Sequence, residues 1–212
     1  MAKKQRNTRP TFKRNVAQST QNLGKIPIWG WFAGIAVLAV LLVAGLFYLG
    51  LQGAAIANSG IEGVEIFADP GQGHQSGDLT YTQDAPVGGV HNPEWLHCGI
   101  YNEPVRLENV IHSMEHGAVW IAYQPDLPGG QVETLRNLVR AEQSRQGERL
   151  IVLAPKLDLE DPIVATAWRV QLRLNDASDE RLLQFVQRYQ RGPFTPELGA
   201  NCTFGGVGEP LS

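Results

Sequence analysis

An uninterrupted apolar run near the N-terminus constrains this 212-residue chain more than any other feature. No charged residue or histidine occurs between positions 26 and 57, and the segment IWGWFAGIAVLAVLLVAGLFYLGL alone has 24 residues. About 20 apolar residues are enough for a helix to cross the hydrocarbon core of a bilayer. A helix buried in a soluble domain is rarely apolar on every face over this length. The sequence therefore predicts a transmembrane helix at residues 26–51.

The charges that flank this run predict its orientation. Residues 1–25 contain seven Lys and Arg and no acid, and cytoplasmic segments next to a span are typically enriched in these cations. We expect a single-pass protein of the cell membrane, with a cytoplasmic basic tail at 1–25, a linker of small residues at 52–60 and an extracytoplasmic domain at 61–212. A cleaved signal peptide is the alternative, but its apolar region is usually only about 7–15 residues long.

The domain beyond the linker is acidic. It contains 11 of the 18 Lys and Arg and all 21 Asp and Glu, which gives a net charge near −10. Nucleic acids select positively charged surfaces, so we expect no nucleic-acid partner. The acidic surface is compatible with cations and with cationic partners.

The two cysteines, Cys98 and Cys202, both lie in this domain. In an oxidising compartment a pair of cysteines is most simply a disulfide. This bridge would close a loop of about a hundred residues, which stabilises the folded state by up to about 4–5 kcal/mol on the chain-entropy argument. In the alternative interpretation, Cys98 is a metal ligand beside His97.

Periodic segments in the domain predict an α+β fold. We expect a mostly antiparallel sheet with two packing helices, preceded by one transmembrane helix. The apolar face of the second packing helix consists of Leu182, Phe185, Val186 and Tyr189. Strands are expected at residues 63–69, 78–83, 117–124, 149–156 and 163–174, and helices at 129–147 and 178–190.

The segment HSMEHG, residues 112–117, is the densest group of chemically versatile side chains. His112, Glu115 and His116 match the H-x-x-E-H pattern of one class of zinc peptidases. On a helix both histidines could bind zinc while Glu115 acts as a general base. A peptidase also needs a third ligand and a substrate cleft, and a five-residue pattern with three fixed positions often arises by chance. We therefore favour a protein that is not an enzyme.

A metal site without hydrolysis is the second interpretation of this segment. In an extended segment, side chains two residues apart point the same way. Two imidazoles and a thioether would then share one face, which suits copper first and zinc second. Histidines from the preceding loops could complete the coordination shell. The candidate ligands are His74, His91, His112, His116 and Met114.

The sequence leaves the conformation of residues 106–116 open. An apolar stripe at i, i+3, i+4 and i+7 also permits a helix, in which Met114 would turn about 200° away from His112 and join the core. In the third interpretation the histidines only hydrogen-bond backbone carbonyls and shape a loop. The protein would then be an accessory or interaction subunit of a membrane complex.

A longer stretch around the motif resembles a known family. The run HCGIYNEPVRLENVIHSMEHGAVWIAYQPDL, together with the earlier histidines and the later IVATAWRVQLRL, is similar to bacterial membrane-anchored proteins that form a domain-of-unknown-function family carrying the HSMEHG block. In the segment before the first domain tryptophan, DAPVGGVH matches the family at His91 but lacks its hydroxyl-bearing residues. The resemblance implies an extracytoplasmic domain on a single anchor and supplies no activity.

Overall fold

The computed structural model describes residues 28–57, 60–147 and 150–211. The predicted basic tail at 1–25 lies outside the described residues, as do residues 58 and 59 of the predicted linker. The chain divides into two compact units, residues 1–50 and 51–212.

Helix α1 (Ile28–Ala57) covers most of the apolar run. Its side chains are described at residues 31–32 and 34–46, where they are exposed. In the described parts of the chain, no helix is long and apolar enough to cross a membrane. The finding overturns the predicted transmembrane helix at 26–51, and with it the predicted single-pass location in the cell membrane.

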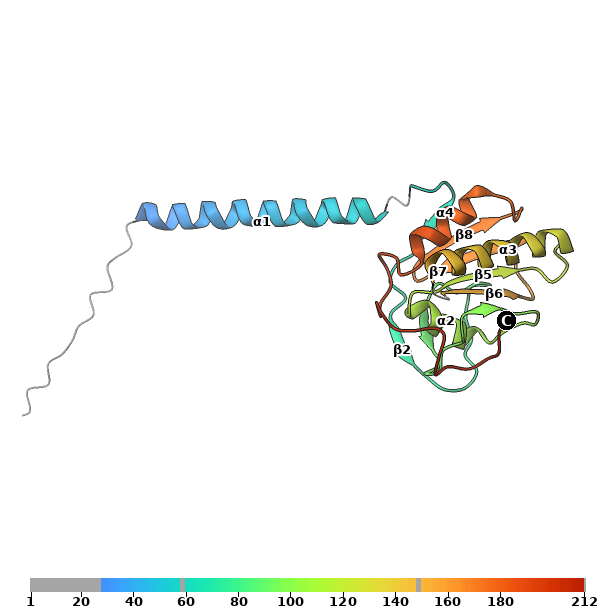
Figure 1. Cartoon of the computed structure of the whole chain (residues 1–212). Coiled ribbons are helices and arrows are strands. Elements are labelled where there is room, and N and C mark those ends of the chain that lie inside the picture. Colours follow the sequence, from blue (N-terminus) through green and yellow to red (C-terminus); the bar gives the residue numbers. More distant parts are fainter. Residues whose placement is uncertain (1–27, 58–59, 148–149, 212) are drawn as a thin grey trace, which may run out of the picture. The chain divides into compact units, whose positions relative to one another are not determined.

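The second unit is built on a mixed sheet (Figure 1). Among its described residues, six strands pair in the order β1-β8-β7-β5-β6-β4. Strands β1, β8, β7 and β5 pair antiparallel, whereas β6 pairs parallel with both β5 and β4. The strands are β1 (Val64–Ile66), β4 (Gly99–Ile100), β5 (Val119–Tyr123), β6 (Ile151–Pro155), β7 (Ile163–Ala167) and β8 (Val170–Leu174).

The α+β class is confirmed, but the sheet is mixed rather than mostly antiparallel, since three of the pairings between its described strands are antiparallel and two are parallel. Helix α3 (Gly129–Gln146) connects β5 to β6, and a helical crossover of this kind lets consecutive strands run parallel. The predicted number of packing helices is also too low. The described part of this unit has a third helix, α2 (Leu107–Glu115), in addition to α3 and α4 (Glu180–Tyr189).

The sheet separates two hydrophobic cores. Alternate residues of β5 point to opposite faces, as expected for a strand: Ile121 belongs to the core under α3 and α4, and Trp120 to the core under α2. Figure 1 shows α3 and α4 on one side of the sheet and α2 on the other. The sheet thus gives α2 a rigid apolar support, and the other side of α2 is available for polar side chains.

A tight turn and a disulfide define two further connections of this unit. The predicted strand at 163–174 is a hairpin of β7 and β8, which turns at Arg169 with a φ of 68°. Cys98 and Cys202 form a disulfide with a Cα–Cα distance of 5.3 Å across a separation of 104 residues. The bridge holds the C-terminal segment next to the loop that precedes β4.

Candidate metal centre

Two short strands and one helix bring three histidines together. Strands β2 (Gln72–His74) and β3 (Gly89–His91) pair parallel, in a register that places His74 opposite His91. Helix α2 packs against β3 and contributes His112. The three ring centroids are 4.8 Å, 4.8 Å and 4.9 Å apart, so the imidazoles form a nearly equilateral triangle.

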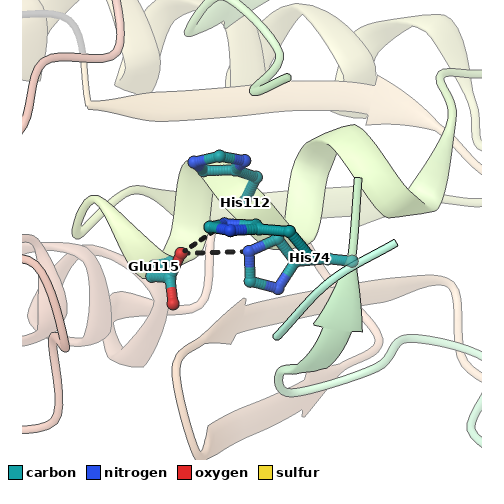
Figure 2. A group of neighbouring side chains, drawn as sticks. His74, His112 and Glu115 are labelled. Carbon is teal, nitrogen blue, oxygen red and sulfur yellow. Dashed lines mark hydrogen bonds and ion pairs between the residues drawn. The ribbon is translucent and has the colours of Figure 1, made fainter. Parts of the chain in front are cut away.

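Glu115 adds a carboxylate to this triangle. It follows His112 by three residues on α2, and residues at this spacing share one face of a helix. Its Oε2 lies 3.0 Å from His91 Nε2 and 3.5 Å from His74 Nε2. Figure 2 shows Glu115 beside His74 and His112, with its two contacts to imidazole nitrogens dashed. One ligand atom from each of the four residues lies within 4.8 Å of every other, so this His–Glu cluster could hold a metal ion.

The separations fit a shared ion with a small adjustment. With bond lengths near 2.0–2.2 Å, two ligand atoms on a tetrahedral ion lie about 3.4 Å apart, and the widest possible pair lies about 4.2 Å apart. The two contacts of the carboxylate oxygen match the first value, and the largest separation, 4.8 Å, exceeds the second slightly. The side chain of His74 is 46 % exposed, whereas that of His91 is fully buried. His74 is therefore the ligand that can move inward.

The hydrogen bonds of the two buried rings occupy Nδ1 and leave Nε2 as the nitrogen that could bind a metal ion. His91 Nδ1 donates to the carbonyl oxygen of Gly89 at 2.7 Å, and His112 Nδ1 donates to that of Asn92 at 2.7 Å. A carbonyl oxygen can only accept, so each Nδ1 carries a hydrogen and each neutral ring has its lone pair on Nε2. Histidines that bind metals usually have this second hydrogen bond, which fixes the tautomer and the ring orientation.

The environment keeps His112 neutral. The pKa of its imidazole is lowered to about 4, mainly by burial and also by the neighbouring rings of His116, His91 and His74, although the hydrogen bond to Asn92 acts in the opposite direction. At neutral pH its Nε2 therefore offers a lone pair and carries no proton that a cation would have to displace.

His97 contrasts with these rings. Its Nδ1 donates to the carbonyl oxygen of Gly208 at 2.8 Å, and its Nε2 accepts the backbone N–H of Gly206 at 3.1 Å. Both ring nitrogens are satisfied by the backbone, so His97 fastens the C-terminal segment. Its neighbour Cys98 is bonded to Cys202, so neither of these predicted alternatives supplies a metal ligand.

Two further candidates lie outside the cluster. Residues 107–115 are helical, which turns Met114 away from the histidines, and its side chain is fully buried in the core under α2. The ring of His116 lies 4.6 Å from that of His112, but its Nδ1 donates to the carbonyl oxygen of Asn201 at 2.7 Å. Among the described residues, neither one belongs to the four-ligand group.

The match to a family model coincides with this architecture. The model is described as "Protein of unknown function (DUF3105)", and it matches residues 74–204. The chain belongs to the DUF3105 family. The matched range starts at His74, the first residue of the His–Glu cluster, and includes the remaining histidines and both cysteines. No curated protein and no solved structure matches the chain.

The H-x-x-E-H pattern of this DUF3105 domain is arranged differently from a zinc peptidase. In a peptidase both histidines bind the ion and the glutamate stays free to act as a base. Here the carboxylate of Glu115 lies among the ligand atoms, while His116 Nε2 is 3.5 Å from Oε2 of Glu197. The sequence pattern indicated a possible general base at Glu115, whereas the structure places its carboxylate among the candidate ligand atoms. Its spacing of three residues from His112 was the available signal.

Proposed function

We propose that this protein binds a divalent transition-metal ion in the His–Glu cluster and does not transform a substrate there. The observation that carries the proposal is the pair formed by His91 Nε2 and Glu115 Oε2. When the ring of His91 is neutral, its Nδ1 hydrogen bond leaves a lone pair on Nε2, and this nitrogen faces a carboxylate oxygen at 3.0 Å inside the protein. The two lone pairs repel each other at this distance, and a cation bound between them would replace the repulsion with a metal–nitrogen and a metal–oxygen bond.

The burial of the carboxylate supports a bound cation. The side chain of Glu115 is 3 % exposed, and an unpaired buried charge costs several kcal/mol. A divalent ion would compensate this charge and would also use the lone pairs of the three imidazoles. The backbone carbonyls that orient His91 and His112 would then hold these rings in position before the ion binds.

The donor set indicates which ions fit. Imidazole nitrogens and a carboxylate oxygen suit Zn(II) and Cu(II), whereas Cu(I) is selected by thioether and thiolate sulfur. Met114 is buried in the core, and the two cysteines form a disulfide. Four protein ligands are typical of zinc sites that hold the ion, whereas catalytic zinc sites keep one position open. These points support sequestration or delivery of Zn(II) or Cu(II).

Calorimetric titration of the full chain tests this function. After removal of metal with a chelator, Zn(II) and Cu(II) are added separately, and we expect one tightly bound equivalent. At a free concentration 100 times the Kd, the ion should stabilise the fold by about 2.7 kcal/mol.

Matched variants locate the ion. His74→Ala removes an exposed ligand without opening the core and should weaken binding at least about tenfold, since one charge-assisted ligand contact is worth about 1.5–3 kcal/mol. His97→Ala removes a histidine outside the cluster and should leave the tight equivalent in place. Wild-type protein that takes up no metal would refute the proposal, and would favour the alternative of an interaction subunit with structural histidines.

A further inference from the structure

His116 presents a second pair of ligand atoms beside the cluster. Its side chain is 6 % exposed, and its Nδ1 donates to the carbonyl oxygen of Asn201. When this ring is neutral, its lone pair is therefore on Nε2, as it would be in His91 and His112. This nitrogen faces Oε2 of Glu197 at 3.5 Å, and the side chain of Glu197 is half exposed.

The separation matches that of two ligands on one ion. At 3.5 Å the contact is longer than a charge-assisted hydrogen bond, which is about 2.7–2.9 Å. It equals the distance between His74 Nε2 and Glu115 Oε2 inside the cluster, and it agrees with the about 3.4 Å expected for neighbouring ligands of a tetrahedral ion. Since Glu197 reaches solvent, water molecules can complete the coordination.

The C-terminal segment holds both ligands in place. The backbone N–H of Glu197 donates to the carbonyl oxygen of Glu115 at 3.1 Å. The side chain of Asn201 accepts the N–H groups of Thr203 and Phe204 at 2.9 Å each. The next residue, Cys202, is bonded to Cys98. The carbonyl that orients His116 is thus fixed by a turn and by a covalent tie.

Trp95 closes the space between the two groups. Its ring lies 5.6 Å from that of His112 and 5.0 Å from that of His116. The neighbouring imidazoles of the cluster and of the second pair therefore pack against one aromatic surface, which restricts their rotation. The nitrogen of His116 remains directed toward Glu197.

We propose that His116 and Glu197 form an outer metal site, distinct from the His–Glu cluster, for a divalent ion of the zinc or copper class. Two protein ligands give it a lower affinity than the four of the cluster. Its solvent-facing carboxylate leaves water as the remaining ligand, so ions bind and leave it readily. The outer site depends on the C-terminal segment and does not require that the cluster be filled.

Zinc titration of metal-free full chain tests the outer site. We expect wild type to bind a second equivalent, weaker than the first. Glu197→Gln keeps the shape of an exposed side chain and should weaken this second equivalent at least tenfold without changing the first. Glu209→Gln removes the same charge from an exposed position of the same segment and should leave both equivalents as in wild type.

The outcomes separate the two sites. Glu115→Gln should weaken the tight equivalent and preserve the weak one. A wild type that binds only the weak equivalent, and loses it in the Glu197→Gln variant, would defeat the proposed function and retain the outer site. Equal binding by the Glu197→Gln and Glu209→Gln variants, with every equivalent that the wild type binds retained in both, would overturn the outer site.

Discussion

Replacing Glu115 by Gln should stabilise the metal-free protein and abolish its stabilisation by metal. The change is isosteric at a side chain that is 3 % exposed. In the metal-free protein the amide can donate an N–H to the lone pair of His91 Nε2, which lies 3.0 Å from the present oxygen. One such hydrogen bond is worth about 0.5–1.5 kcal/mol, and the substitution also removes a buried charge.

The magnitude is measurable by thermal unfolding. For a chain of about 150–250 residues, 1 kcal/mol corresponds to about 2–4 °C in Tm, so the variant should melt about 3 °C higher than wild type in chelator. With zinc at 100 times the wild-type Kd, the wild type gains about 2.7 kcal/mol. The variant should gain much less, so the order of the two melting temperatures reverses.

A structural ion pair predicts the opposite sign. If Nε2 of His91 carried a proton and formed a permanent ion pair with Glu115, removing the carboxylate would leave the buried imidazolium uncompensated. The protein would then lose about 3–5 kcal/mol of stability. A Glu115→Gln variant that melts well below wild type in chelator, with no zinc response in either protein, would refute the metal-site reasoning.

Three further predictions concern the framework of the domain. Replacing Cys98 and Cys202 by Ser should lower the free energy of unfolding by about 4–5 kcal/mol, because the bridge closes a loop of 104 residues; denaturant titration measures this, and a loss below about 1 kcal/mol would contradict it. Burial raises the pKa of Asp84, but the hydrogen bonds and charge of Arg173 outweigh this and lower the pKa to about 2. Because the folded-state pKa is lowered, this carboxylate should add about 2 kcal/mol to the free energy of unfolding at pH values above its unfolded pKa of about 3.9. This contribution should be lost as the pH falls to about 2, and Asp84→Asn should remove that part of the acid dependence of stability. Phe185→Ala should cost about 3–5 kcal/mol, because the ring is fully buried between α4 and the sheet, and a change below about 1 kcal/mol would show that the packing is wrong.

Local periodicity predicted the packing faces of the domain. The four apolar residues expected on one face of the last helix are all buried on α4. The strand predicted directly after HSMEHG is β5, and its side chains alternate between the two cores. These features depend on neighbours a few residues apart, and sequence patterns report such neighbours directly.

Several features depend on information that local patterns do not contain. The parallel pairing of β5 and β6 follows from the helix between them, and the expected transmembrane helix is not supported in the described part of the chain. The turn at Arg169 has no glycine or asparagine to indicate it, although its φ is positive. A hairpin therefore looked like one continuous strand.

The convergence of the ligands was the least predictable part of the site. Strands β2 and β3 have three residues each and include glycine, which disfavours strands, so their pairing and register left no pattern. This register alone places His74 opposite His91. His116 contacts a segment about 85 residues away, so nothing near the motif indicated that it faces Glu197.

X-ray absorption at the zinc edge of the full chain, loaded with one equivalent of Zn(II), tests whether the four residues of the His–Glu cluster bind the ion. We expect four nitrogen or oxygen ligands at about 2.0–2.2 Å, with outer-shell scattering from three imidazoles and no sulfur near about 2.3 Å. A spectrum with fewer than two imidazoles, or with a sulfur ligand, would contradict this expectation.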